Sequence, residues 1–182
     1  MTLSFRRATL QDANSIAQIG HISYLHHFQS IWNDFDELKD YVAHEYHLTS
    51  ILQSLNEENT QWWIIVNSLN EAIGFIKLSL AQTPSEHYPH IQIDALSHGC
   101  CLNKVYLLPQ YTGQGLGQQI FKFVEQHLQQ QTCQYFWLEV LKDNLAAKQF
   151  YLRQGMQIIA DAEYQYTGQQ HQLHIMSKTL NF

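Results

Sequence analysis

The sequence predicts a single α/β domain built on a mixed sheet, and three observations support this prediction. The chain has 182 residues, of which 45% are hydrophobic and 13% aromatic, so it can bury one sizeable core. Short runs rich in β-branched and aromatic residues interleave with stretches of helical apolar spacing. The resulting order is strand, helices, two strands, strand, helix, strand, helix, two strands. This order favours antiparallel hairpins early and late, and parallel crossovers in the middle.

The N-terminal part is expected to contain a strand, a capped helix and further helical turns. Residues 5–8 form the strand, and Thr9 and Asp12 have the spacing of a helix N-terminal cap. The apolar and aromatic residues that favour the following helix are Ile16, Ile19, Ile22 and Tyr24. Residues 28–58 are polar and aromatic, and they predict one or two more helices.

The central part is predicted to pair two strands across a turn and then to enter a long loop. Strands are expected at 61–67 and 72–80 because the first segment is β-branched and aromatic and the second returns after a turn at 68–71. Residues 81–98 contain two of the three prolines and predict a long loop, with a short strand at 91–93.

The C-terminal part alternates strands with helices. We expect strands at 100–108 and 135–140, a helix at 144–153, and late strands at 157–160 and 172–178.

Local patterns support these C-terminal elements. Apolar residues recur every four positions on one helix face, at Leu116, Ile120, Val124 and Leu128. Gly155 follows the helix at 144–153 and suits its C-terminal cap. Residues 164–166 are expected to pair with the last strand through a turn at Thr167 and Gly168.

Composition and charge narrow the function classes. The formal net charge is −6 and no basic cluster is longer than Arg6-Arg7, so nucleic acid and anionic membranes are expected to be poor partners. The acidic surface either favours a cationic substrate or only serves solubility. No apolar run approaches the ~20 residues of a membrane span, and the N-terminus lacks a secretion signal. Three cysteines, with Cys100 and Cys101 adjacent, argue against a disulfide framework and for a reducing cytosol.

Three glycines lie between the strand at 100–108 and the next helix, at Gly113, Gly115 and Gly117. Glycines let a backbone adopt unusual dihedral angles and approach a ligand closely. The first N–H groups of a helix have no partner within the helix and carry partial positive charge. Together these properties predict a phosphate or pyrophosphate site. A tight strand-to-helix turn without a ligand is the simpler alternative.

Two nucleotide-binding motifs fit this segment less well. A Walker A loop needs Lys followed by Ser or Thr after its last glycine, where this chain has Gln118 and Gln119. The dinucleotide fingerprint needs G-x-G-x-x-G and an acidic residue ~20 positions later, and Glu139 meets the second condition. The spacing here is G-x-G-x-G, however, and too little chain follows for a doubly wound sheet.

Two blocks of the sequence resemble the GNAT superfamily, the Gcn5-related N-acetyltransferases. The acetyl-CoA loop of that family reads Q/R-x-x-G-x-G/A after an apolar-Pro pair, and here QYTGQG at 110–115 follows LLP at 107–109. The second block is a strand, an Asn and a helix ending in Phe-Tyr and Gly, which matches Asn144, Phe150-Tyr151 and Gly155. The resemblance covers essentially the whole chain. The motifs KVY at 104–106, WLEV at 137–140 and YTGQQHQL at 166–173 look closest to the PaiA-like branch, which is similar to spermidine/spermine N-acetyltransferases.

The resemblance implies a fold, an activity and a co-substrate. The GNAT fold has a central mixed sheet of six to seven strands flanked by about four helices, and a splayed strand pair forms the acetyl-CoA slot. Residues 1–182 would form one cytoplasmic N-acetyltransferase domain that transfers acetyl from acetyl-CoA directly to a primary amine, such as spermidine or spermine, without a metal. N-acetylation of a protein or peptide amine, and a non-catalytic CoA-binding or sensory domain, are the alternatives. A homodimer through the late hairpin is left open.

The resemblance also assigns roles to individual residues. The positions that match cofactor contacts are Leu107, Leu108, Gln110, Gly113, Gln114, Gly115, Leu116, Gly117, Gln118 and Asn144. The amides of residues 114–118 would hold the pyrophosphate, and a backbone N–H near Leu107 would polarise the thioester carbonyl. Asn144 is otherwise a plain helix cap. Tyr151 matches the general acid that reprotonates the leaving thiolate, and a core aromatic beside Phe150 is its alternative role.

The general base is the role that the sequence leaves open. Many family members have Glu at the position of Cys101, and a thiol matches that role poorly. A water chain or a side chain of the long loop could replace it, and the loop candidates are Glu86, His87, His90 and Asp94. Glu139 is a further candidate, although a strand residue facing solvent or a partner is its simpler interpretation.

Other groups of side chains carry weaker signals. The acidic residues that would either attract a cationic amine or form a solvated helix face are Asp34, Asp36, Glu37 and Asp40. The eleven histidines lack metal-binding spacing, since His44-Glu-Tyr-His47 is one residue short of H-E-x-x-H. A nucleophile at Cys100 or Cys101 would need a histidine base that the sequence does not place.

Overall fold

A computed structural model describes residues 1–91, 98–166 and 169–181. Their strands follow the order β1-β2-β3-β4-β5-β7-β6, so the predicted α/β fold on a mixed sheet is confirmed. The chain divides into two compact units, Met1–Leu78 with Lys104–Ile120, and Ser79–Asn103 with Phe121–Phe182. Strand β4 (Gly99–Leu107) and helix α4 (Leu116–Gln130) contribute residues to both units.

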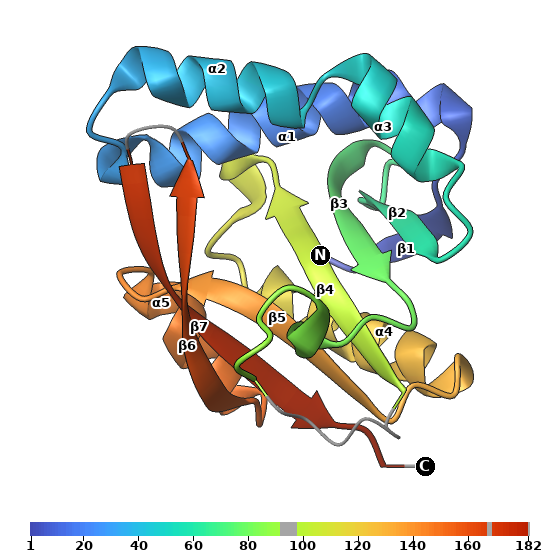
Figure 1. The fold of residues 1–182 in the computed structure, drawn as a ribbon. Helices are drawn as coiled ribbons and strands as arrows, with labels where there is room; N and C mark the ends of the chain where they lie inside the picture. Colours follow the sequence, from blue (N-terminus) through green and yellow to red (C-terminus); the bar gives the residue numbers. More distant parts are fainter. Residues whose placement is uncertain (92–97, 167–168, 182) are drawn as a thin grey trace. The chain divides into compact units, whose positions relative to one another are not determined.

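The first unit contains the N-terminal strands and helices. Its elements are β1 (Ser4–Arg7), α1 (Ala13–Phe28), α2 (Phe35–Glu45), α3 (Leu48–Leu55), β2 (Thr60–Val66) and β3 (Ala72–Ser79), whose last residue belongs to the second unit. Strand β1 pairs with β2 in antiparallel register, and α2 and α3 lie along α1 (Figure 1). The predicted strands and the further helices are therefore confirmed, with slightly shifted ends. No helix among the described residues is long and apolar enough to cross a membrane.

The approach to α1 is fixed by a capping box and an ion pair. The N–H and hydroxyl of Thr9 donate to Asp12 Oδ2 at 2.8 and 3.1 Å, and the Arg6 guanidinium makes two hydrogen bonds to the same carboxylate. The hydrogen bond from Arg6 is the main reason that the pKa of Asp12 is lowered to about 2. The predicted N-terminal cap is confirmed.

The second unit contains the C-terminal strands. Its elements are β5 (Tyr135–Leu141), α5 (Leu145–Arg153), β6 (Gln157–Tyr166) and β7 (Gln169–Thr179). Strands β4 and β5 are parallel, and their register runs from Gly99 opposite Tyr135 to Cys101 opposite Trp137, which confirms the predicted crossover. Strand β7 is antiparallel to both β5 and β6, and the β6–β7 hairpin is drawn in red in Figure 1.

Strand β6 is longer than the predicted strand at 157–160. It continues to Tyr166 past an irregularity between Ile158 and Ala160, and Tyr164 lies opposite His171 of β7. The predicted pairing of 164–166 with the last strand is thereby confirmed. The turn expected at Thr167 and Gly168 lies outside the described residues. So does most of the strand expected at 91–93, and Ile91 itself is not in a strand.

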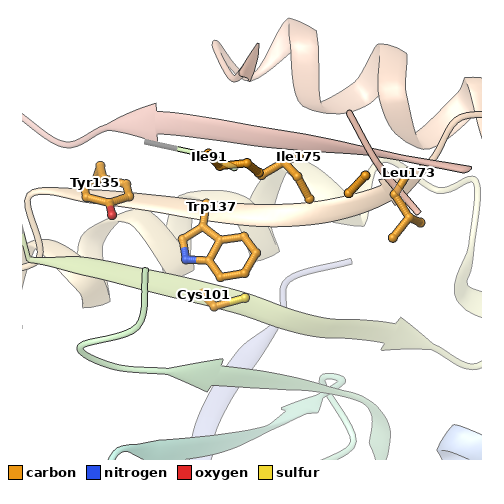
Figure 2. Close-up of a cluster of buried hydrophobic side chains, with 7 residues drawn as sticks. Ile91, Cys101, Tyr135, Trp137, Leu173 and Ile175 are labelled. Carbon is orange, nitrogen blue, oxygen red and sulfur yellow. The ribbon is translucent and has the colours of Figure 1, made fainter. Parts of the chain in front are cut away.

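The core of the second unit includes a cluster that we call the β5 cluster. Its members are Ile91, Cys101, Tyr135, Trp137, Ala162, Leu173 and Ile175, which Figure 2 shows along β5 and its neighbours. The Trp137 indole N–H donates to the Gln82 carbonyl at 2.9 Å, so the loop before β4 is attached to this core. Helix α4 begins in the first unit and continues in the second, and its predicted apolar face is buried at all four positions, Leu116, Ile120, Val124 and Leu128.

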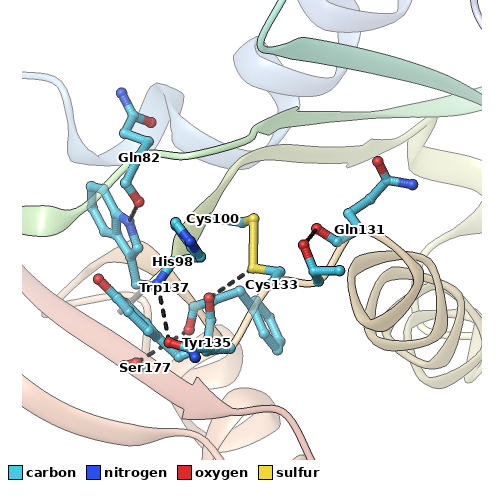
Figure 3. The surroundings of a disulfide bond; sticks show 11 residues. Gln82, His98, Cys100, Gln131, Cys133, Tyr135, Trp137 and Ser177 are labelled. Carbon is cyan, nitrogen blue, oxygen red and sulfur yellow. Dashed lines mark hydrogen bonds between the residues drawn. A yellow bond between two sulfur atoms is a disulfide. The ribbon is translucent and has the colours of Figure 1, made fainter. Parts of the chain in front are cut away.

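The structure corrects the cysteine prediction. Cys100 of β4 forms a disulfide with Cys133, and their Cα atoms are 6.3 Å apart (Figure 3). Parallel pairing of β4 with β5 brings these positions together, which the odd cysteine count could not reveal. Cys101 is buried and is not part of this disulfide. The cysteines therefore do not support the inference of a reducing cytosol.

Gly20 of α1 provides a test of packing in the first unit. A Cβ atom at Gly20 would lie 2.2 Å from ring carbons of Tyr46, which is buried. Replacing glycine by alanine inside a helix ordinarily stabilises a protein by ~1 kcal/mol. We expect Gly20→Ala instead to destabilise it by about 1–3 kcal/mol in urea denaturation, because the ring must move. Gln18→Ala, at an exposed position of α1, is the control and should be neutral or stabilising. Unchanged or higher stability of Gly20→Ala would contradict the packing.

Candidate active site

The loop between β4 and α4 has the unusual backbone that its glycines predict. Gly113 and Gly115 both have φ of +73°, a left-handed conformation that residues with side chains rarely adopt. A Cβ atom at either position would meet nothing within 4 Å, so the backbone and not crowding requires glycine here. The space beside both residues is open, as close approach of a phosphate requires.

Polar contacts within the loop support this conformation. The Thr112 hydroxyl donates to the Pro109 carbonyl at 2.8 Å, and the Gln114 side-chain amide donates to the Gln110 carbonyl at 2.7 Å. Helix α4 begins at Leu116, and its first turn contains no acidic residue. The partial positive charge of this helix N-terminus is therefore not neutralised by the helix's own first turn.

Leu107, the last residue of β4, and Leu108, which follows it, direct their backbone groups to different sides. Leu108 donates its N–H to the Ile73 carbonyl of β3 at 2.8 Å. Because backbone groups alternate in direction along a strand, the N–H of Leu107 points away from β3. The Ser23 hydroxyl of α1 donates to the Leu107 carbonyl at 3.0 Å and fixes this end of the strand. All the predicted cofactor residues from Leu107 to Gln118 belong to the first unit.

Asn144 and Tyr151 belong to the second unit and are placed by α5. The Asn144 side chain accepts a hydrogen bond from the Ala147 N–H at 3.1 Å, so Asn144 caps the helix. Gly155, with φ of +83°, follows the last turn, which confirms the predicted C-terminal cap. Contact of Asn144 with a cofactor stays a prediction.

Tyr151 lies among aromatic rings of the second unit. Its ring centroid is 5.4 Å from that of Phe150 and 6.2 Å from that of Phe121. The residue is partly exposed, and desolvation by its surroundings raises the pKa of Tyr151 to about 12. The phenol therefore keeps its proton at neutral pH. The ring contacts fit a core aromatic, and the retained proton fits a general acid.

The structure separates the loop candidates for the general base. Glu86 accepts hydrogen bonds from the N–H and hydroxyl of Thr83, so its carboxylate caps a short 3-10 turn. A ring nitrogen of His87 is hydrogen-bonded to the Gln82 side chain of the same loop. A ring nitrogen of His90 is hydrogen-bonded to the Asp161 carbonyl of β6. Asp94 lies outside the described residues.

Cys101, Tyr88 and Glu139 are brought to one face of the sheet in the second unit. Cys101 is part of the β5 cluster, and Tyr88 packs against that cluster. The Tyr88 hydroxyl donates to Glu139 Oε1 at 2.9 Å. Glu139 was a candidate from sequence, whereas Tyr88 was missed. A tyrosine in a polar loop gives no local signal of a partner 51 residues away.

The acidic residues near the start of α2 have structural partners. Asp34 accepts hydrogen bonds from the N–H groups of Asp36 and Glu37, at 2.7 and 3.2 Å, and so caps the helix. Asp36 pairs with Lys39 at 2.9 Å. These contacts support the helix-face interpretation for Asp34 and Asp36.

The first unit also contains a small cavity of about 110 Å³. Its lining residues are His44, Glu45, Ser50, Ile51, Ser54, Trp62, Lys77 and Lys104. Lys104 pairs with Glu45 at 2.6 Å and the Trp62 indole donates to the Ser54 hydroxyl at 3.1 Å, so much of its polar lining is already bonded. Within the described ranges, no three His, Cys, Asp or Glu side chains are grouped to hold a metal ion.

Comparison with known proteins establishes the family. Residues 25–156 match the acetyltransferase (GNAT) family, and this match covers more than half of the chain. The protein belongs to this family of acyl-transferring enzymes. The family resemblance of the two sequence blocks is thereby confirmed.

One relative by sequence is an uncharacterized N-acetyltransferase in the pepI 3′ region of Lactobacillus delbrueckii subsp. lactis. The two sequences are 29% identical over 86 residues, which cover 47% of this chain and 46% of the relative. The matched segment therefore spans about half the length of that protein.

Solved structures with the same fold include three acetyltransferases. The PaiA N-acetyltransferase from Thermoplasma acidophilum, in complex with coenzyme A, has a TM-score of 0.74 and 16% identity, over 98% of this chain and 99% of that one. The spermidine/spermine N-acetyltransferase SpeG from Vibrio cholerae has a TM-score of 0.65 and 15% identity, over 98% and 95%. Arabidopsis thaliana NAA60 with acetyl-CoA has a TM-score of 0.68 and 16% identity, over all of both chains. At these identities the likeness shows the fold alone.

Substitution of Asn144 tests the capping role that the structure assigns to it. Asn144→Ala should lower the free energy of unfolding by ~1 kcal/mol, because the Ala147 N–H loses its acceptor. Asn144→Asp keeps an acceptor at the helix N-terminus and should retain stability. Urea denaturation without any ligand separates this effect from cofactor binding. Full stability of Asn144→Ala would contradict the cap.

Proposed function

We propose that the protein is an acetyl-CoA-dependent N-acetyltransferase that transfers an acetyl group directly to a primary amine. The observation that carries this proposal is the open, left-handed turn at Gly113 and Gly115, which leads into a helix start without acidic residues. Membership of the acetyltransferase family supports it, as does the fold shared with an N-acetyltransferase in complex with coenzyme A.

The first unit would provide the cofactor contacts. Acetyl-CoA would supply the acetyl group as an activated thioester. The N–H groups of residues 114–118 would bind its pyrophosphate, and the glycines at 113, 115 and 117 leave room for the phosphate oxygens. The N–H of Leu107, directed away from β3, would polarise the thioester carbonyl. The remaining proposed contacts are Leu108, Gln110, Leu116 and, from the second unit, Asn144.

Tyr151 is the proposed general acid. Burial raises the pKa of Tyr151 to about 12, so its hydroxyl carries a proton throughout the pH range in which an amine reacts. The thiol of coenzyme A has a pKa of about 8.5 in water, which is lower than that of this phenol. The surroundings that desolvate Tyr151 must therefore also raise the pKa of the departing thiol for the proton to pass to sulfur in the transition state.

A polyamine is the proposed acceptor within the class of primary amines. The formal charge of −6 favours a cationic substrate electrostatically. The fold is shared with a spermidine/spermine N-acetyltransferase and with PaiA.

The activity is tested by release of free thiol from acetyl-CoA. We expect thiol release that depends on an added amine, with spermidine and spermine among the active acceptors. Simple alkylamines and a peptide with a free N-terminus form the comparison arms. Binding of acetyl-CoA without turnover on any amine would contradict the enzyme and favour a CoA-binding domain.

Gly115→Val tests the pyrophosphate loop. A branched side chain at φ of +73° strains the backbone and occupies the open space, so we expect affinity for coenzyme A to fall at least ~10-fold in calorimetry. Gly155→Val is the matched control, because it places the same side chain at φ of +83° outside the loop and should leave the affinity nearly unchanged. Equal affinity of Gly115→Val and wild type would remove the loop from the proposed site.

Tyr151→Phe tests the general acid. We expect kcat to fall by about 100-fold while affinity for coenzyme A is kept, since the phenol acts only on the departing thiolate. Steady-state thiol release measures kcat, and calorimetry measures the affinity for coenzyme A. Unchanged kcat would assign Tyr151 to the aromatic core alone.

A further inference from the structure

The loop at residues 82–91 is attached to the sheet of the second unit at several points. The Gln82 carbonyl accepts the indole N–H of Trp137 at 2.9 Å, and Ile91, which is 5% exposed, is a member of the β5 cluster. A ring nitrogen of His90 is 3.2 Å from the Asp161 carbonyl of β6. The loop therefore covers this face in a defined position, and Tyr88 projects from its middle.

Tyr88 is held between the loop and the sheet. Its N–H donates to the Pro84 carbonyl at 2.8 Å, and its carbonyl accepts the N–H of Ile91 at 2.9 Å. Its half-buried ring packs against the β5 cluster. Burial, and then the nearby carboxylate of Glu139, raise the pKa of Tyr88 above its ordinary value. The hydroxyl therefore stays protonated and acts as a donor to Glu139.

Glu139 lies on the same face of β5 as Trp137, because side chains alternate along a strand. Trp137 is opposite Cys101 of β4, so Glu139 lies on the face to which Cys101 contributes its thiol. The Asn103 side-chain amide donates to Cys101 Sγ at 3.4 Å, so the sulfur of Cys101 accepts a hydrogen bond from its own strand. This face of the sheet in the second unit thus has a carboxylate on β5.

Glu139 combines a fixed position with an available oxygen. The residue is exposed, and Tyr88 holds Oε1 at 2.9 Å. Among the residues that the structure describes, none donates to Oε2, and no Lys or Arg pairs with this carboxylate. A carboxylate without a cationic partner is a ready acceptor for the charge and proton of an amine.

We infer that Glu139, oriented by Tyr88, accepts the proton that the acceptor amine loses during acetyl transfer. This inference rests on the proposed function. As the amine nitrogen bonds to the acetyl carbon and the carbon–sulfur bond breaks, the nitrogen becomes acidic and its proton passes to Glu139 Oε2. Tyr151 supplies the proton that the departing sulfur takes up. Glu139 is the catalytic base, and Tyr88 is a positioning residue.

The named neighbours of Glu139 are uncharged. Tyr88 of the loop donates to its Oε1, and β7 places the apolar Ile175 opposite it. Cys101 of β4 and Tyr164 of β6 act on Tyr88. None of these side chains carries a charge at neutral pH in its ordinary protonation state, so the amine would supply the positive charge that faces the carboxylate.

Glu139→Gln is the direct test, on the full-length protein with the amine found in the thiol-release screen. We expect kcat/KM for the amine to fall by about 100-fold or more, with affinity for coenzyme A unchanged. Glu139→Asp should recover part of the activity. The control is Glu163→Gln, another exposed strand carboxylate whose partners are Gln170 and Gln172, and it should behave as wild type.

Tyr88→Phe provides a second, independent readout. Removing the hydroxyl leaves Glu139 without its positioning donor, so kcat should fall by a smaller factor than in Glu139→Gln while affinity for coenzyme A is kept. The same substitution should have no further effect in the Glu139→Gln background. If Glu139→Gln fails to fold by circular dichroism, the loss of kcat in Tyr88→Phe decides alone. Wild-type activity in either folded variant would overturn the inference while leaving the proposed function intact. Absence of amine-dependent thiol release in the wild type would instead reject the proposed function.

Discussion

The candidate site depends on one backbone constraint, the left-handed turn between β4 and α4. Two glycines with φ of +73° let the chain leave the strand and begin a helix without a side chain over the turn. The loop's own Thr112 and Gln114 stabilise this path. The bond from Leu108 to β3 then orients the last residues of the strand. A helix N-terminus with open approach follows directly from these local contacts.

In the second unit, the polar Tyr88–Glu139 pair lies beside the apolar β5 cluster. Trp137 and Ile175 form part of a buried cluster, and the loop above it is attached through the indole N–H. The ring of Tyr88 packs against this cluster, and its hydroxyl donates a hydrogen bond to Glu139. A carboxylate held in this way keeps one position without losing contact with solvent. Such an arrangement combines the rigidity that catalysis needs with access for a cationic substrate.

The two cysteine outcomes illustrate how tertiary pairing changes the meaning of a residue. Cys100 and Cys101 are neighbours in sequence, but alternate side-chain directions along β4 send them to opposite faces. Cys100 forms a disulfide with Cys133, while Cys101 packs in the β5 cluster. Counting cysteines treats the three as equivalent, and the fold does not.

The sequence by itself determined the elements, the glycine turn and the caps at Thr9, Asn144 and Gly155, because each depends on residues a few positions apart. Only the tertiary structure decided the Tyr88–Glu139 pair, across 51 residues, and the disulfide, across 33. Spacing along the chain encodes local hydrogen bonds and apolar faces, whereas contacts between distant segments arise from strand register and loop path. The physical reason is that strand register and loop path are set by the packing of the whole unit.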